Sequence, residues 1–476
     1  MKKRTALLFL LSFATAPLRA EPAPTPSPTL TPTAAITSIP FGRYGDVTIT
    51  QPAKAPQHAV ILISGRDGWN PTMDHIAAEL SAQGALVMGV DGARMLNVIR
   101  IRQEKCAYPA TDFETMSQTF QKQLGVAAYL PPVLIGMGAG GTLAYAALAQ
   151  APPTTFAGAI SLGFCPVLPV SKPFCKGNGL DQEAVTGMPG FRFLPAKTLE
   201  APWVVLEGKA DEVCDEKLVE AFSKQVLHGD IVLLPNVDHK FSDEKLWMTQ
   251  LRDVFARVAA GEDPTPDSED ASTKGLPLIE IPAKGTAKDV YAILISGDGG
   301  WAGIDRSLGK SLSEQGVSVV GLNSLKYFWK KRNPDEAGND LERIMRHYFA
   351  QWKKKSVILV GYSRGADVLP FMANRLPADM RARTSLVVLL GLEKSIEFEI
   401  HAGAIFNMKG KNELPIRPEL DKLKGQKVAC FYGSDESDSL CRELPPDLAE
   451  VIVMKGGHHF DGDYKGIAQQ ILSRAK

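Results

Sequence analysis

Short apolar runs recur along the chain and alternate with longer stretches in which apolar residues have helical spacing. In the C-terminal half, helix-like segments at 305–315 and 338–352 lie between the apolar runs at 292–295 and 357–360. Apolar runs of this length predict buried strands, and the segments between them predict helices. Strands that alternate with helices predict an α/β fold, in which helices cover both faces of a mainly parallel sheet.

The same pattern occurs twice along the chain. The segment 63–69, Ile-Ser-Gly-Arg-Asp-Gly-Trp, matches the segment 295–301, Ile-Ser-Gly-Asp-Gly-Gly-Trp, and the same register carries Gly89 onto Gly321. An ungapped match over about 30 residues indicates an internal duplication. The sequence therefore predicts two tandem α/β-hydrolase-like domains, once the motifs described below are taken into account.

Length and composition set the boundaries of the predicted domains. The chain has 476 residues, which is too long for one core and sufficient for two domains of about 200 residues each. Residues 261–275 are acidic, contain proline and have few apolar side chains, as expected for a linker. We therefore expect one domain at 39–260 and the other at 276–476.

The N-terminus has the features of a secretory signal peptide. Residues 1–4 are basic, residues 6–13 form an apolar core too short to cross a bilayer, and Ala20 is the small residue expected before the cut. Residues 21–38 are rich in Pro and Thr, which predicts an extended, disordered segment. We expect residues 1–20 to be removed and the mature protein to be soluble and exported.

Composition and cysteine content bear on which ligands and which disulfides the protein can have. Hydrophobic residues make up 45% of the chain, charged residues 22%, and the formal net charge is zero. These values are ordinary for a globular protein and do not indicate nucleic-acid binding. The chain lacks a Cys-x-x-Cys pair, so we expect no metal site, and nothing indicates a cofactor. Six cysteines permit disulfides after export, and the pairings we expect are Cys165 with Cys175, Cys430 with Cys441, and Cys106 with Cys214.

Residues 361–365, Gly-Tyr-Ser-Arg-Gly, lie between a predicted strand and a predicted helix. This Gly-x-Ser-x-Gly pattern is typical of a nucleophile elbow, a tight turn that holds the serine hydroxyl over the edge of a sheet. Ser363 is therefore the candidate nucleophile. The alternative is a glycine-rich turn that only packs a helix against the sheet.

A base and an acid are found further along the chain. His458 lies in a glycine-rich loop after a predicted strand, where an α/β hydrolase carries its histidine, and we expect His459 to point elsewhere. The acid should follow the preceding strand, at 427–432. Two aspartates there are the leading candidates, Asp438 and Asp435, and Glu436 is a further alternative because of its Gly-x-x-acid spacing.

The intermediate of acyl transfer needs N–H donors for its oxyanion. One donor is expected from Arg364, the residue after the nucleophile, and another from the glycine loop 296–301, which contains Asp298 and Gly299. Glycines in this loop allow the backbone to approach a ligand closely. A phosphate-binding loop is excluded, because no Lys-Ser or Lys-Thr follows at the required spacing.

The N-terminal copy carries Gly138 where the second copy carries Ser363. Asp211 and His239 still lie where the acid and the base would be. Because glycine has no side chain that can attack, the first domain is predicted to be degenerate at the nucleophile position. We expect it to serve packing or binding.

The motifs resemble the VirJ/AcvB family of bacterial virulence-associated periplasmic proteins. The residues that carry the resemblance are 295–301, the aromatic run 327–329 with Arg332 and Pro334, the elbow with Ala366 and Asp367, and the loop 457–462. The two-half length resembles AcvB rather than the shorter VirJ. This resemblance implies an α/β-hydrolase fold, a periplasmic location and serine esterase chemistry.

For AcvB-like members the resemblance further implies hydrolysis of lysyl-phosphatidylglycerol, an aminoacylated phospholipid, to lysine and phosphatidylglycerol. The amines of a lysyl ester would need carboxylates nearby, and Asp367, Asp461 and Asp298 are candidates by position. Each of the three is also explained as a helix cap or a solvated loop residue.

A lipid substrate would require transient contact with the membrane surface. Lys330, Lys331 and Arg332 follow three aromatic residues, a combination that suits a membrane interface. The alternative is a buried aromatic cluster with a solvated charged tail. A different class of function is also implied, because VirJ-type relatives are associated with type IV secretion: an adaptor that binds exported or secretion-system proteins.

Overall fold

The computed structural model describes residues 35–261, 268–400 and 412–475, and Ala34–Lys476 makes up one compact unit. The predicted signal peptide, residues 1–20, lies outside the described residues. We call residues 35–261 the first half and residues 268–475 the second half. Within the described ranges, no helix combines the length and the apolar character needed to cross a bilayer.

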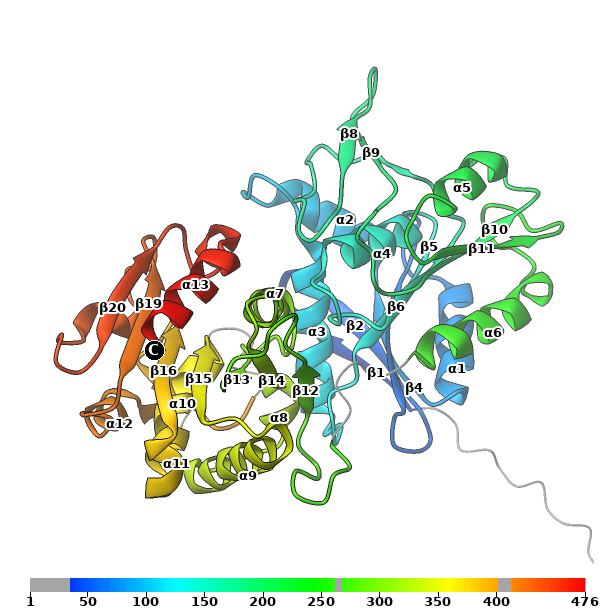
Figure 1. Ribbon diagram of the computed structural model, residues 1–476. Helices are drawn as coiled ribbons and strands as arrows, with labels where there is room; N and C mark the ends of the chain where they lie inside the picture. The colour runs from blue at the N-terminus through cyan, green and yellow to red at the C-terminus, as the bar shows by residue number, and fades with distance from the viewer. Residues whose placement is uncertain (1–34, 262–267, 401–411, 476) are drawn as a thin grey trace, which may run out of the picture. The chain divides into compact units, whose positions relative to one another are not determined.

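The first half is built on an eight-stranded sheet (Figure 1). From one edge to the other, its strands are β1 (Ala35–Pro40), β2 (Asp46–Gln51), β4 (Ala85–Val90), β3 (His58–Ile63), β5 (Pro132–Met137), β6 (Gly158–Leu162), β10 (Trp203–Gly208) and β11 (Gly229–Leu234). The six strands β4, β3, β5, β6, β10 and β11 are parallel to one another, and β2 is antiparallel to both β1 and β4.

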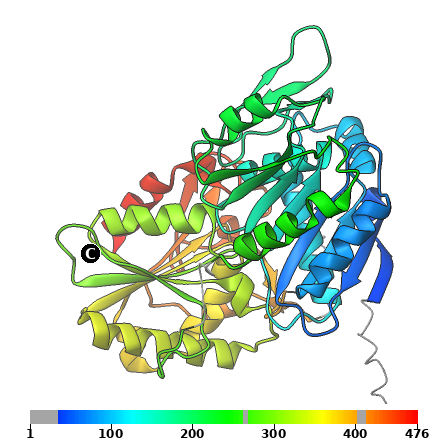
Figure 2. The same ribbon diagram turned by 90° about the vertical axis from the view of Figure 1, so that its right-hand side faces the viewer.

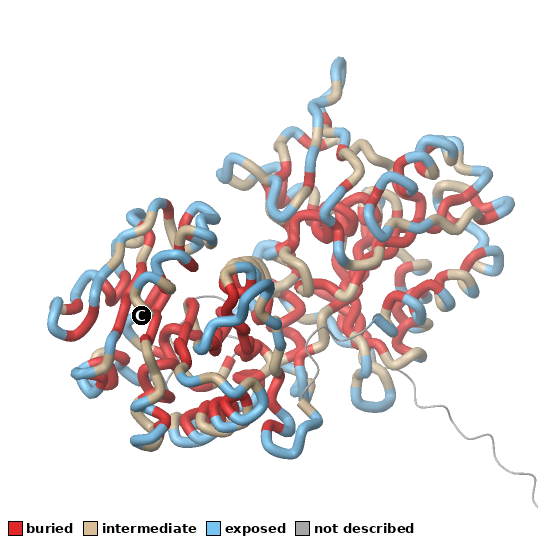
Figure 3. Tube along the Cα trace, in the orientation of Figure 1, coloured by how far each residue is buried: buried red, intermediate tan, exposed pale blue. Residues whose placement is uncertain are grey.

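Helices cover both faces of this sheet (Figure 2). They are α1 (Pro71–Ala82), α2 (Gly92–Ile101), α3 (Pro109–Gln123), α4 (Ala139–Gln150), α5 (Glu216–Ser223) and α6 (Met248–Ala259). Successive residues of a strand point to opposite faces, so Ile61 packs with α3 and α4, whereas Val60 and Leu62 pack with α1 and α6. The central strands are therefore apolar without alternation and buried on both sides (Figure 3).

The second half repeats this plan with a seven-stranded sheet. In spatial order its strands are β12 (Leu278–Ile281), β14 (Ser318–Leu322), β13 (Val290–Ile295), β15 (Ser356–Tyr362), β16 (Thr384–Leu390), β19 (Val428–Gly433) and β20 (Glu450–Met454). Only β12 is antiparallel to its neighbour. The order is that of the first sheet without its first strand.

Two layers of helices again enclose the sheet. The helices are α7 (Gly303–Glu314), α8 (Ser324–Tyr327), α9 (Pro334–Trp352), α10 (Arg364–Asn374), α11 (Ala378–Ala382), α12 (Arg417–Asp421) and α13 (Tyr464–Arg474). α7 and α13 pack on one face of the sheet, and α9 and α10 pack on the other. α9 begins with a capping box between Asn333 and Glu336, with Pro334 in the first turn.

Small elements decorate the loops of both halves. A three-stranded sheet of β7 (Val167–Leu168), β9 (Phe191–Phe193) and β8 (Gln182–Ala184) is inserted between β6 and β10. A pair of short strands, β17 (Ser395–Ile396) and β18 (Leu414–Pro415), follows β16. Short 3-10 turns include η1 (Gly42–Tyr44), η2 (Glu244–Leu246), η4 (Leu440–Glu443) and η5 (Phe460–Gly462).

In each half, a central strand turns sharply into a helix: β5 into α4, and β15 into α10. A strand–elbow–helix unit at the centre of a largely parallel sheet is the arrangement of the α/β-hydrolase fold. The predicted α/β fold is confirmed, and both sheets have this arrangement.

Two predicted segments have more structure than expected. Residues 35–38, placed in the disordered N-terminal segment, lie in β1 and pair with β2. Of the predicted linker, 262–267 lie outside the described residues, and 268–275 pack on α9. The Arg343 side chain donates to the carbonyls of Ser272 and Lys274, and Thr273 is buried.

The disulfides correct two of the three expected pairings. Cys430 pairs with Cys441, but the other bonds join Cys106 to Cys175 and Cys165 to Cys214. Cys165 and Cys214 follow β6 and β10, which are neighbours in the sheet, so the loops at their carboxyl ends meet. Sheet order, rather than distance along the sequence, decided this pairing.

Candidate active site

Ser363 lies at the turn from β15 into α10 with a φ of 51°. This left-handed conformation is strained for a residue with a side chain, and the flanking glycines make the turn possible. A Cβ atom on Gly361 would collide with the carbonyl of Gly365, and one on Gly365 would collide with the carbonyl of Ile295. Close backbone packing therefore requires both glycines.

Ser363 and His458 line the same cavity, which has a volume of about 630 Å³. This volume falls within the range of ordinary ligand pockets, roughly 300–1,000 Å³. The cavity lies at the carboxyl ends of β13 and β15, where the glycine loop and the elbow meet. No hydrogen bond joins the Ser363 hydroxyl to another described residue, so the hydroxyl is available to a ligand.

His458 is held by Glu436. The imidazole Nδ1 lies 2.6 Å from the Glu436 carboxylate, whose other oxygen accepts the backbone N–H of Gly433 at 2.6 Å. The two aspartates expected to come first, Asp438 and Asp435, are exposed and make no hydrogen bond to the histidine. The acid beside His458 is therefore Glu436, and the expectation that Asp438 or Asp435 would hold this position is corrected.

The neighbours of His458 determine its charge. Burial on its own would lower the pKa of His458, but the hydrogen bond and the charge of Glu436 raise this pKa above its ordinary value, with help from Glu393 and Asp298. The hydrogen bonds from His458 and Gly433 outweigh the effect of burial on Glu436 and lower the pKa of its carboxyl. Glu393, which follows β16, was not identified from the sequence.

His459 has a different environment from that of His458. Its Nδ1 lies 3.0 Å from the Tyr362 hydroxyl. Burial and the neighbouring His458 lower the pKa of His459. His459 lines the cavity as well, but it has no carboxylate partner among the described residues.

Residues 289–476 match the model of a family described as bacterial virulence protein (VirJ). Residues 289–476, which make up most of the second half, are therefore a VirJ-family domain. We call it the VirJ domain from here on, and the expected membership of this family is confirmed for these residues. No curated protein matches the chain.

Solved structures with similar coordinates cover about half of the chain. A putative dienelactone hydrolase from Klebsiella pneumoniae is 18% identical, with 48% of this chain and 98% of that chain aligned and a TM-score of 0.34. The esterase domain of a Rhodothermus marinus protein is 15% identical, with coverages of 48% and 98% and a TM-score of 0.32. An α/β serine hydrolase without lid from Xanthomonas campestris is 15% identical, with coverages of 49% and 96% and a TM-score of 0.29.

The VirJ domain has backbone donors beside the elbow. The N–H groups of Asp298, Gly299 and Arg364 make no hydrogen bond to other described residues, and all three residues lie next to Ser363 in the fold. The N–H of Gly297, in contrast, donates to the buried carboxyl of Asp305. Asp305 thus shapes the loop, and it was not identified from the sequence because it falls within a helical segment.

Of the three aspartates considered for substrate amines, only Asp298 lines the cavity. Asp367 is 3% exposed and accepts the backbone N–H of Glu393 at 2.8 Å, so it fastens the loop after β16 beneath the elbow. Asp461 is exposed, lies in η5 and is not among the residues that line the cavity. The structure corrects the expectation for Asp367 and Asp461.

The first half preserves the frame of the site without its nucleophile. Gly138 has φ 52° and ψ −119°, and Ser363 has φ 51° and ψ −123°. His239 Nδ1 lies 2.7 Å from the Asp211 carboxylate, and a Cβ atom on Gly138 would lie 3.8 Å from His239 Nε2. The first half thus has the elbow backbone and a hydrogen-bonded His–Asp pair, with a glycine at the nucleophile position.

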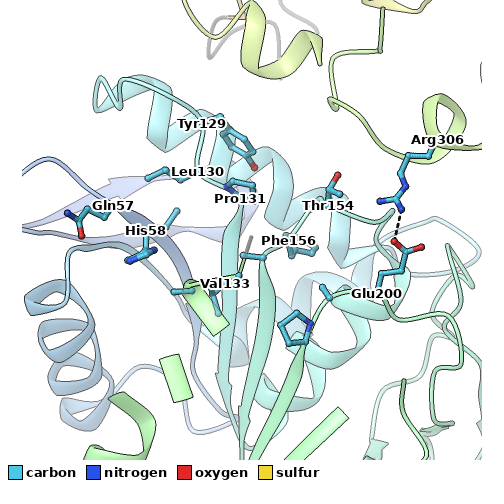
Figure 4. A pocket seen from close by; sticks show the side chains of 16 residues that line it. Gln57, His58, Tyr129, Leu130, Pro131, Val133, Thr154, Phe156, Glu200 and Arg306 are labelled. Carbon is cyan, nitrogen blue, oxygen red and sulfur yellow. Dashed lines mark hydrogen bonds and ion pairs between the residues drawn. The ribbon is translucent and has the colours of Figure 1, made fainter. Parts of the chain in front are cut away.

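A further cavity of about 600 Å³ adjoins the amino ends of β3 and β5 (Figure 4). Its wall includes His58, Tyr129 and Phe156, and Glu200 and Arg306 form an ion pair of 2.7 Å at its edge. No serine lines it. The candidate nucleophile Ser363 and the candidate base His458 both line the other cavity, which is therefore the candidate active site.

Proposed function

We propose that the protein is a periplasmic serine esterase in which Ser363 is the nucleophile, His458 the general base and Glu436 the orienting acid. The observation that carries this proposal is the elbow serine in one cavity with a histidine that is hydrogen-bonded to a carboxylate. A serine hydroxyl is a weak nucleophile at neutral pH, so it requires such a base.

The proposed reaction proceeds in two halves. His458 takes the hydroxyl proton as Ser363 Oγ attacks the ester carbonyl carbon. The N–H of Arg364 and an N–H of the glycine loop, from Asp298 or Gly299, stabilise the oxyanion. Collapse of the tetrahedral intermediate breaks the ester bond, and the departing alcohol takes the proton from His458. Water then attacks the acyl-serine by the same route and releases the acid.

The substrate proposed is an aminoacyl ester lipid, lysyl-phosphatidylglycerol. Hydrolysis of its ester bond yields lysine and phosphatidylglycerol. Family resemblance suggests this lipid, and the acidic cavity supports a cationic acyl group, since Asp298 and Asp305 both line it. No cofactor is needed for this chemistry.

Contact of the protein with a lipid surface would depend on exposed basic side chains. Tyr327, Phe328 and Trp329 are buried, so they belong to the core and cannot insert into a membrane. They form the buried aromatic cluster that was given above as the alternative to a membrane interface. Lys330 and Lys331 are exposed and remain available to attract anionic lipids.

The deciding experiment is to incubate the purified protein with lysyl-, alanyl- and unmodified phosphatidylglycerol and to measure the amino acid released. We expect release from the lysyl lipid by the wild type and none by Ser363→Ala. If the wild type releases no amino acid from any of these lipids, the proposed substrate is wrong.

A second candidate is a secretion-associated adaptor, which is favoured by a first half that keeps its fold but has lost its nucleophile. The Ser363→Ala variant separates the two functions. An adaptor retains its role in secretion after this change, whereas an esterase loses its activity.

A further inference from the structure

The first half contributes part of the wall of the active-site cavity. Tyr108, just before α3, and Glu114 of α3 line it, as do Gln150, the last residue of α4, and Pro152. The Tyr108 hydroxyl donates to the Gln150 carbonyl at 2.9 Å, so these two parts of the wall are connected. The VirJ domain alone would leave this side of the cavity open.

Specific contacts hold α3 in this position. The Trp329 indole donates to the carbonyl of Val126, just after α3, at 2.8 Å. The ammonium of Lys122 on α3 forms an ion pair with Glu399 at 3.0 Å. The Tyr129 ring packs against Trp329 with a centroid distance of 5.2 Å, and both side chains are buried.

Glu114 lies directly over the glycine loop. A Cβ atom placed on Gly299 would be 3.7 Å from a carboxylate oxygen of Glu114. Asp298 in the same loop and Asp305 of α7 line the cavity too. Three carboxyl groups from two halves of the chain therefore surround one part of the cavity.

No close ion pair neutralises these carboxyl groups. None of the three lies within ion-pair distance of a described Lys, Arg or His side chain, although Asp298 interacts with the charges of Arg364 and His458 from further away. One oxygen of the buried Asp305 carboxyl has no hydrogen-bond partner. Burial and the charge of Asp298 raise the pKa of Glu114 to about 8. Burial and the same charge raise the pKa of Asp305 well above its ordinary value, against the backbone hydrogen bonds that lower it. Unpaired carboxyls in a confined space are costly, and a bound cation would relieve that cost.

We propose that Glu114 of the first half, together with Asp298 and Asp305, binds an ammonium group of the substrate's acyl part, so that the first half determines selectivity for cationic aminoacyl esters. This inference rests on the proposed esterase function and gives the degenerate half a role in it. Glu114 contacts the acyl part and takes no part in bond breaking.

The test compares kcat/KM for lysyl-phosphatidylglycerol with kcat/KM for p-nitrophenyl butyrate, a neutral ester. Glu114→Gln keeps the shape of the side chain and removes its charge. We expect this change to lower the lysyl-to-butyrate ratio about tenfold to a hundredfold, the usual worth of a hydrogen bond to a charged group. Glu114→Asp should restore part of the ratio. The matched control is Glu183→Gln, an exposed glutamate of β8, which should leave the ratio unchanged.

Alanyl-phosphatidylglycerol identifies the ammonium group. An equal loss on the alanyl lipid supports recognition of the α-ammonium, and a loss confined to the lysyl lipid supports recognition of the ε-ammonium. An unchanged lysyl-to-butyrate ratio in a folded Glu114→Gln variant, with the melting temperature as the check on folding, overturns the inference.

A measurement without turnover separates this inference from the proposed substrate. Lysinamide should slow the labelling of Ser363 by a fluorophosphonate in the wild type, and Glu114→Gln should weaken this protection by a similar factor. Protection without hydrolysis of any lipid would reject the lipid substrate and keep the ammonium site. Hydrolysis of the lysyl lipid with equal protection in both proteins would reject the ammonium site alone.

Discussion

At the residue scale, the chemistry depends on a few side chains whose surroundings differ. Ser363→Ala should abolish both ester hydrolysis and fluorophosphonate labelling, because Ser363 is the only elbow serine of the two halves. His458→Ala should lower kcat by about 10⁴-fold or more, as in other triads. His459→Ala should cost far less, since its ring nitrogen faces the Tyr362 hydroxyl. Steady-state kinetics on a soluble ester measures both, and reversed costs would contradict the assignment of the base.

Glu436 allows a prediction about pH. His458 must be neutral to accept the serine proton, so activity is lost as pH falls through its pKa, which Glu436 raises. Glu436→Gln removes that charge, so the pKa of His458 should fall and the acidic limb of the rate profile should move to lower pH. The plateau rate should drop about 10³–10⁴-fold, because the imidazole loses its orienting carboxylate. Asp438→Asn and Asp435→Asn are the matched controls, and an equal loss in either would reject Glu436 as the acid.

At the element scale, the junction of β15 with α10 requires glycine where the backbones meet. Gly365→Ala should place a methyl group against the Ile295 carbonyl and destabilise the protein by about 3 kcal/mol or more. Chemical denaturation measures this loss. Gly457→Ala is the matched control, since no atom lies within 4 Å of a Cβ atom there. Similar stabilities for the two variants would show that the elbow relaxes more easily than its packing indicates.

At the scale of the whole molecule, the two halves differ at the elbow residue and also in the loop opposite the elbow. Gly138→Ser in the Ser363→Ala background should remain unlabelled by a fluorophosphonate, although the backbone at Gly138 would accept a serine. The loop opposite this elbow carries Arg66, whose guanidinium donates to the Pro169 carbonyl at 2.9 Å, where the VirJ domain has Asp298. Labelling of this double variant would show that only the serine was missing.

The surface lysines allow a prediction about the membrane. Replacing Lys330 and Lys331 by Gln should weaken binding to anionic vesicles by about 2 kcal/mol, at roughly 1 kcal/mol for each lysine. Hydrolysis of a short soluble ester should not change. Vesicle co-sedimentation measures the binding, and replacing Lys209 and Lys240, which are exposed on the first half, controls for net charge. Equal losses in the two double variants would reject a specific docking site.

The sequence by itself determined what depends on neighbours in the chain. Short apolar runs predicted the strands because apolar side chains are removed from water when a strand is buried inside the sheet. The Gly-x-Ser-x-Gly spacing identified Ser363 because a tight turn needs glycines at fixed positions, and the internal repeat identified Gly138 as its counterpart. The α/β fold followed from these local patterns, and the same motifs carry the resemblance of residues 289–476 to the VirJ family.

Tertiary structure alone decided which distant groups meet. Three acids share one loop, and only the path of the backbone after β19 turns Glu436 rather than Asp435 or Asp438 towards His458. Neighbouring strands brought Cys165 to Cys214. Packing buried Asp367 beneath the elbow and placed Glu114 over the glycine loop. Hydrogen bonds and charges act over a few ångströms in space, and the order of residues along the chain does not contain those distances.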